Sequence, residues 1–336
     1  MKRVAVCAFA TLAAFLVGAV AGVAQPGLDC SRAKSAVEKV ICTEPALASA
    51  DAEMTMAYAA LHAALPADQR SALRANQRQW LAERDGACRE KGPALARCLT
   101  EETEARRRFL VGEGPNGAPR APRLLPNFYY EESKARRYEI SIQYPQIPNP
   151  AGAAASEFNN QSRKVAFGAG PAAATEIRNA ERPSRDEAAK FYNASYEITY
   201  LDSRFASVVF SIASYEGGAH PNGESVALLY SFSRGRPLRL SDFLADPGKA
   251  IPAIADRCRR EAEKEDWGLF DNPDFVDVVK DISSWSAGSD GIEILFNPYS
   301  VAPYVSGPHA CRLTYAELMP FLKPGGPLPP HRNGKN

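Results

Sequence analysis

The strongest constraint on the fold is a change of hydrophobic periodicity across a segment rich in proline and glycine. Residues 112–126 contain three Gly and four Pro, and almost no apolar side chain before Leu124. Apolar residues recur at helical spacing before this segment, and strand-like runs follow it. A segment of this composition buries little apolar surface. We therefore predict a linker at residues 111–127, between a helical domain at 28–110 and a strand-rich domain at 128–322.

The helical pattern is clearest in one run whose members follow each other at alternating spacings of four and three. These residues are Leu47, Asp51, Met54, Tyr58, Leu61 and Leu65. Such spacing places them on one face of a helix. Pro66 ends this helix, a second one reaches Cys88, and after a break at Gly92 a third runs to Leu110. The pattern predicts a small bundle of α-hairpins.

Five runs after the linker are rich in β-branched and aromatic residues and are bounded by turn residues. They cover residues 138–143, 196–200, 206–214, 225–233 and 292–296. Two helical stretches, at 250–265 and 315–322, accompany them. We predict an α+β fold in which a mainly antiparallel sheet carries packed helices. Proline and glycine return at 323–336, where we predict a disordered tail.

The first 24 residues have the pattern of a cleavable signal peptide. Lys2 and Arg3 precede an apolar run from Val4 to Val23, and Ala24 is small enough to precede a cleavage site. Cleavage after Ala21 is the alternative, and a retained membrane anchor is a second one. The apolar run lacks a positive flank after it, so we expect a periplasmic or secreted protein without stable membrane insertion.

The chain that remains after cleavage has an even number of cysteines, as is typical of disulfide-bonded exported proteins. These are Cys30, Cys42, Cys88, Cys98, Cys258 and Cys311. Their positions favour two pairs in the helical domain and one pair downstream, while the connectivity stays open. No CxxC motif is present, so we predict structural disulfides and no metal site.

Charge argues against nucleic acid as a partner. The formal charge is +1, and removal of Lys2 and Arg3 leaves 38 basic and 39 acidic residues, or −1. A nearly neutral protein has little long-range attraction for polyanions.

Motifs of catalysis are few. The sequence contains no HExxH, GxSxG or P-loop motif, and we predict no catalytic residues and no cofactor. His220 is the one histidine in an unusual backbone context, because Gly217 and Gly218 precede it and Pro221 follows. It could face a partner, or act as the general base of an envelope hydrolase, or simply bond to neighbouring carbonyl groups.

A second candidate site is a loop that repeats a Pro-Tyr pair just after a predicted strand. Tyr299 and the pair Pro303 and Tyr304 belong to it. Aromatic side chains held by proline lose little entropy on binding, which suits recognition. The alternative is that both rings pack into the core of their own domain.

The helical part resembles the N-terminal domain of the lysozyme-inhibitor LprI family over residues 28–110. The matching positions are Asp29, Cys30, Glu38, Ile41, Cys42, Leu47, Asp51, Tyr58, Gln77, Trp80, Arg84, Cys88 and Cys98. Among the open connectivities, we expect sequence neighbours to pair, Cys30 with Cys42 and Cys88 with Cys98, beside Cys258 with Cys311.

The later part, residues 128–322, resembles the extracytoplasmic domain shared by the anti-sigma factor RsiV and the deacetylase PdaC. The matching stretches are 138–145, 217–221, 238–244 and 291–304. This chain carries neither the sigma-binding segment of RsiV nor the deacetylase domain of PdaC, so neither activity is implied.

Both resemblances imply lysozyme as a target. We expect a non-enzymatic binding protein of the cell envelope that recognises or inhibits lysozyme, or another muramidase, or binds peptidoglycan. Tyr299, Pro303, Tyr304 and His220 are its predicted binding residues. A hydrolase that uses His220 and an envelope adaptor module are the alternatives.

Overall fold

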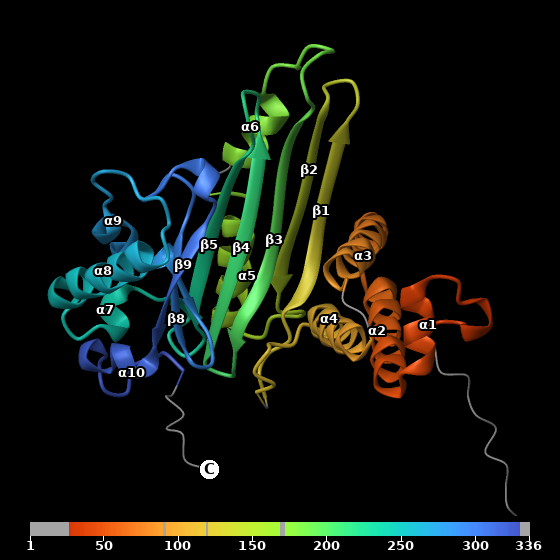
Figure 1. Cartoon of the computed structure of the whole chain (residues 1–336), viewed down its shortest axis with the longest axis horizontal. Helices are drawn as coiled ribbons and strands as arrows, with labels where there is room; N and C mark the ends of the chain where they lie inside the picture. The colour runs from red at the N-terminus through yellow and green to blue at the C-terminus, as the bar shows by residue number, and fades with distance from the viewer. Residues whose placement is uncertain (1–26, 90–91, 119, 169–171, 330–336) are drawn as a thin grey trace, which may run out of the picture.

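The computed structural model describes residues 27–89, 92–118, 120–168 and 172–329. The predicted signal peptide and the end of the predicted tail, 330–336, lie outside the described residues. Figure 1 shows helices at one end, a long sheet in the middle and a smaller sheet with its own helices at the other end. The predicted α+β fold class is confirmed.

Four helices form the N-terminal region. They are α1 (Ala36–Thr43), α2 (Pro45–Ala64), α3 (Ala67–Ala87) and α4 (Pro93–Val111), preceded by the short 3-10 helix η1 (Cys30–Arg32). Local signals set their ends. Ser35 caps α1 in a capping box with Glu38, and Gly112 closes α4 in the left-handed conformation, with φ of 68°. On the predicted face of α2, Leu47 and Leu61 are buried.

The described residues contain three disulfides, and these pair the cysteines as expected. Cys30–Cys42 ties η1 to α1, and Cys88–Cys98 ties the end of α3 to α4. Their sequence separations are 12 and 10 residues. Cys258–Cys311 spans 53 residues and lies in the strand-rich part.

Six strands form the main sheet, in the same order in space as in the chain. They are β1 (Leu125–Ser133), β2 (Tyr138–Gln146), β3 (Lys190–Leu201), β4 (Phe205–Tyr215), β5 (Asn222–Ser231) and β6 (Arg236–Pro237). Neighbouring strands are antiparallel except β2 and β3, which are parallel. The predicted sheet is therefore mainly antiparallel, with one parallel pair that the sequence patterns missed.

Helices α5 (Ala153–Ala166) and α6 (Ala172–Asn179) form the crossover that a parallel pair requires, and they cover one face of the sheet (Figure 1). Alternate residues of the strands point toward these helices. Ile140, Tyr192 and Phe210 are buried there together with Phe158 of α5. The alternation of apolar and polar residues thus gives the sheet one buried face.

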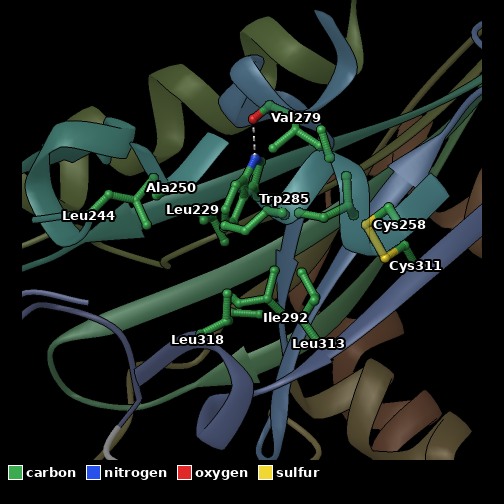
Figure 2. Close-up of a cluster of buried hydrophobic side chains, with 14 of the residues drawn as sticks. Leu229, Leu244, Ala250, Cys258, Val279, Trp285, Ile292, Cys311, Leu313 and Leu318 are labelled. Carbon is green, nitrogen blue, oxygen red and sulfur yellow. Dashed lines mark hydrogen bonds between the residues drawn. A yellow bond between two sulfur atoms is a disulfide. The ribbon is translucent and has the colours of Figure 1, made fainter. Parts of the chain in front are cut away.

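The smaller sheet consists of β7 (Trp285–Ala287), β8 (Gly291–Phe296) and β9 (His309–Thr314). Around it lie α7 (Leu240–Phe243), α8 (Pro247–Lys264), α9 (Phe275–Lys280), α10 (Tyr315–Leu318), and the 3-10 helices η2 (Ile282–Ser284), η3 (Tyr304–Ser306) and η4 (Met319–Phe321). Trp285 is fully buried among them, and its indole N–H donates to the carbonyl of Val279 at 2.9 Å (Figure 2). The Cys258–Cys311 disulfide borders the same cluster and fixes β9 to α8.

The segment predicted as a linker is attached to both regions. The side-chain amide of Asn116 bonds to both backbone groups of Leu201, at 2.9 and 3.0 Å. Phe128, in β1, packs among Met54 and other residues of the helices. The division of the chain into domains therefore stays a prediction, because the last residues of the predicted linker already belong to the sheet.

Residues 323–329, where we predicted the start of a disordered tail, lie against the helices around the smaller sheet. The N–H of Lys323 donates to the carbonyl of Phe243 at 2.7 Å, and Leu328 is buried in the cluster around Trp285. Burial of Leu328 stabilises this segment, which its high content of Pro and Gly did not indicate.

Within the described part of the chain, none of the helices combines the length and the apolar character that are needed to cross a membrane.

Candidate binding site

The first element of the site is the turn between β4 and β5, which carries His220. Gly217 and Gly218 have φ of 116° and 106°, a conformation that side chains with a Cβ rarely adopt. The hydroxyl of Tyr215 donates to the carbonyl of Gly218 at 3.0 Å and closes the turn. The glycine pair therefore lets the chain reverse sharply before His220.

The second element is the loop between β8 and β9. Tyr299 adopts φ of 68°, which is uncommon for a residue with a bulky side chain. Backbone bonds from Tyr299 to Ala302 at 3.1 Å and from Ser300 to Asn297 at 3.0 Å hold this conformation. Pro303 then caps η3, which begins at Tyr304. Both Pro-Tyr pairs thus lie in a tightly bonded loop.

The two elements bring three predicted residues together. The ring of His220 stacks on that of Tyr304, with centroids 4.0 Å apart and planes inclined by 20°. Tyr299 lies beside both rings, at 5.7 Å from Tyr304 and 6.3 Å from His220. We call His220, Tyr299 and Tyr304 the aromatic cluster. It joins positions that are 79 residues apart in sequence.

Hydrogen bonds define the tautomer of His220. Its Nδ1 lies 2.9 Å from the carbonyl oxygen of Pro221, which can only accept, so Nδ1 carries the proton. In the neutral imidazole, Nε2 then accepts a hydrogen bond from the hydroxyl of Tyr299, at 3.2 Å. Both ring nitrogens are occupied, and the imidazole is fixed in orientation.

Asn297 attaches the second loop to β5. Its side-chain oxygen accepts the N–H of Ser225 at 2.7 Å, and its side-chain nitrogen donates to the carbonyl of Ser225 at 3.1 Å. Trp267 stacks on His309 at the foot of the loop, with centroids 4.4 Å apart. These contacts and the Cys258–Cys311 disulfide in β9 stiffen the support of the aromatic cluster.

The loop presents apolar surface to solvent. Tyr299 is 57% exposed and Val305 is 91% exposed, although both are hydrophobic. Exposed side chains of this kind next to rigid aromatic rings are typical of interfaces. No sequence pattern indicated Val305 or Asn297 as part of the site. A valine between Pro303 and Gly307 gives no signal of exposure, and an asparagine does not identify its partner.

Acid–base chemistry finds little support at His220. Its contacts within the described residues are a carbonyl oxygen, a tyrosine hydroxyl and an aromatic ring, with no carboxylate to orient it and no serine or cysteine bonded to it. In the described parts of the chain, histidine, cysteine and acidic residues form no group of three that could hold a metal ion. The geometry suits contact with a partner.

Three families match successive parts of the chain. Residues 30–110 match the family described as "Lysozyme inhibitor LprI", residues 131–223 match "Deacetylase PdaC", and residues 241–316 match "Protein of unknown function (DUF3298)". In this order, the matches agree with the predicted resemblance to an LprI N-terminal domain followed by a PdaC/RsiV-like domain.

Two solved structures show a partial likeness. A member of the DUF3298 family from Bacteroides fragilis has 14% identity and a TM-score of 0.44, over 60% of this chain and 94% of its own. One from Pseudomonas aeruginosa has 14% identity and a TM-score of 0.46, over 62% of this chain and 98% of its own. Among curated proteins, none matches this chain.

Proposed function

We propose that this chain is an exported, non-enzymatic protein that binds lysozyme or another muramidase at the cell envelope, in the periplasm or outside the cell. The LprI match supports lysozyme as the target of this chain. Three disulfides support a location in an oxidising compartment. Peptidoglycan is the related ligand that the same surface could contact.

The observation that carries the proposal is the aromatic cluster with its exposed neighbours. Pro303 and Tyr304 present a ring already stacked on His220, while Tyr299 and Val305 face solvent. Rigid aromatic groups bind at low entropic cost and are frequent energetic centres of interfaces. Muramidases bind sugar rings in a cleft. A preformed projection of aromatic rings could fill such a cleft and exclude the substrate, with no chemistry from this protein.

The experiment measures lysozyme-dependent clearing of a cell-wall suspension with and without the mature protein, and titrates the two proteins by calorimetry. We expect protection and measurable heat, and both should be lost with Tyr304→Ala. Tyr130→Ala is the matched control, because Tyr130 is 48% exposed on β1 and lies outside the aromatic cluster. Absence of heat and of protection would refute the proposal.

The hydrolase and adaptor alternatives give different results in the same assays. Clearing of the wall suspension by this protein alone, abolished by His220→Gln, would favour a hydrolase. Capture of envelope proteins without any effect on lysozyme would favour an adaptor.

A further inference from the structure

The α8–α9 connection, residues 265–274, packs against the loop between β8 and β9. The N–H of Phe270 donates to the carbonyl of Val301 at 3.0 Å. Trp267 stacks on His309, where the loop enters β9. Two contacts, one in the middle of the loop and one at its end, therefore fix this connection beside the aromatic cluster.

The connection also adds exposed apolar surface. Phe270 is 40% exposed, although its backbone is bonded to the loop. Tyr299 and Val305 are exposed on the loop itself. Exposed apolar side chains on segments that contact each other are typical of an interaction surface. The surface around the aromatic cluster is therefore shared by the loop and the α8–α9 connection.

The segments beside the loop are acidic. The α8–α9 connection and the turn that carries His220 hold five carboxylates and no Lys or Arg, namely Glu216, Glu265, Asp266, Asp271 and Asp274. All five side chains belong to exposed residues. Two lysines adjoin these segments, Lys264 at the end of α8 and Lys190 beside the strand partner of Tyr215, and they do not balance five carboxylates.

The five carboxylates differ from their neighbours in being unpaired. In α8 and α9, Glu261 pairs with Arg257 and Asp277 pairs with Lys280. None of the five forms an ion pair within the described residues. The formal charge of the whole chain is +1, so this negative charge is a local property of the surface beside the loop.

A partner of this surface has to fit carboxylates that flank apolar side chains. Peptidoglycan carries carboxylates on its own peptides, and like charges repel each other. A protein cleft bordered by Lys and Arg is attracted instead, and such attraction speeds diffusional encounter and orients the partner. The charges therefore favour a cationic protein over the cell wall.

We propose that the α8–α9 connection is part of the binding surface, and that this surface selects muramidases whose sugar-binding cleft is bordered by basic side chains. The inference rests on the proposed function and names the class of its partner. Phe270 extends the apolar contact made by Tyr299 and Val305. The five carboxylates raise the rate of association and reject anionic ligands.

Opposite charges placed at Val305 test the sign of the partner's charge. The side chain is 91% exposed, so neither Val305→Lys nor Val305→Glu should disturb the fold. Surface plasmon resonance measures the rate constants for a basic lysozyme and the mature protein. At an ionic strength of about 0.01 M, Val305→Glu should associate roughly fivefold faster than Val305→Lys. At about 1 M, where charges are screened beyond about 3 Å, the two rates should converge.

Neutralisation of the carboxylates locates the effect. Glu216→Gln, Asp266→Asn and Asp271→Asn together remove three charges and keep the size of each side chain. Asparagine also tolerates the φ of 51° at position 266. This triple variant should associate about tenfold more slowly at low ionic strength, with little change at high ionic strength.

Matched controls come from other exposed residues. Glu101→Gln, Glu102→Gln and Glu104→Gln change the charge equally on α4, at exposed residues, and should leave the association rate unchanged. Phe270→Ala should raise the dissociation rate by about tenfold, as the loss of an aromatic contact does. Met319→Ala, at a residue that is 51% exposed on η4, should not.

The outcomes separate this inference from the proposed function. Equal association rates for the two Val305 variants, or an equal effect of the α4 control, would overturn the inference and leave lysozyme binding in place. Binding of soluble peptidoglycan fragments that Val305→Lys strengthens would assign the surface to the cell wall and also overturn it. Absence of lysozyme binding to the unchanged protein would refute both proposals.

Discussion

The helical region and the strand-rich region are stabilised in different ways. Buried charged residues, in the parts of the chain that the structure describes, occur only in the helical region, where they are Asp51, Arg84 and Arg106. The buried polar residues of the strand-rich region are serines, such as Ser207 and Ser286. A charge inside a protein needs partners, so the helical region depends on specific contacts more than on apolar area.

The disulfides also differ between the helical region and the strand-rich region. Two bridges close loops of 12 and 10 residues in the helical region, whose two apolar clusters are small. One bridge closes a 53-residue loop beside the large cluster around Trp285. Small cores contribute little net stability, so local crosslinks matter more there. The helical region is thus the part most easily unfolded by a change of its environment.

The largest difference between the two regions is expected when the disulfides of the helical region are removed. Replacing Cys30, Cys42, Cys88 and Cys98 by Ser should cost about 3 kcal/mol per bridge and unfold the helical region, while the sheets stay folded. Hydrogen exchange resolved along the chain measures this. The control is Cys258→Ser with Cys311→Ser, which should loosen α8 and β9 and leave α1–α4 protected. Equal loss of protection in both regions after the fourfold replacement would contradict the comparison.

The next effect compares one buried polar group from each region. Arg106 bonds to the side chains of Gln77 and Asn76, at 2.9 and 2.7 Å, and burial lowers its pKa to about 10. Arg106→Ala should cost about 3 kcal/mol, because it opens a cavity and leaves both amides unpaired. Ser207→Ala removes the acceptor of the Ala287 N–H and of the Thr199 hydroxyl, creates no large cavity, and should cost about 1–2 kcal/mol. Urea unfolding of both variants gives the two values, and the reverse ranking would contradict the account.

Acid should act with opposite signs on the paired carboxylates Glu131 and Asp242 and on the buried carboxyl group of Asp51. Hydrogen bonds from Arg178 lower the pKa of Glu131 to about 2, and those from Arg236 lower the pKa of Asp242 to about 2. Both carboxylates lie in the strand-rich region, and they stabilise it fully above about pH 4.5. That contribution, on the order of 1–2 kcal/mol, is lost as the pH falls toward 2.

Asp51 acts the other way, since burial raises its pKa. Its folded form binds a proton more tightly than the unfolded chain does, so protonation stabilises the helical region as the pH falls. Urea unfolding at pH 6 and pH 3, followed by hydrogen exchange in each region, measures both changes. Glu131→Gln should reduce the acid sensitivity of the sheet. The opposite signs would be refuted if protonation of Asp51 lowered the stability of the helical region between these pH values.

The smallest expected effect concerns the hydroxyl of Tyr299. Tyr299→Phe removes the bond to Nε2 of His220 but keeps the ring, so lysozyme affinity should fall by only a few-fold, which is about 1 kcal/mol. Calorimetric titration measures it. The helical region should show no change in protection. A loss as large as that of Tyr304→Ala would mean that the hydroxyl, not the stacked rings, dominates binding.

The sequence predicted the elements whose apolar pattern is regular. The β-branched and aromatic residues of β4 and the spacing of four and three in α2 are strong signals. β1 was missed because it begins inside the Pro-rich segment. Pro126 lies between the buried residues Leu124 and Phe128 and interrupts the apolar pattern that would indicate a strand. α5 was missed because it opens with three alanines and carries one large apolar anchor, Phe158. Without α5, the parallel pairing of β2 and β3 could not be anticipated.

The candidate site was predictable by residue type but not by arrangement. Glycines before His220 and prolines beside two tyrosines indicate ordered loops. Stacking of His220 on Tyr304 depends on how β5 and β8 are placed, which no local pattern encodes.

Hydrogen exchange of the mature protein alone and bound to lysozyme tests the central claim most directly, because it compares both regions in one experiment. The account predicts new protection at residues 217–222 and 297–307, which form the aromatic cluster and its loops, and loss of that protection with Tyr304→Ala. Protection confined to residues 30–110, with no change around Tyr304, would contradict it and place the lysozyme contact in the helical region.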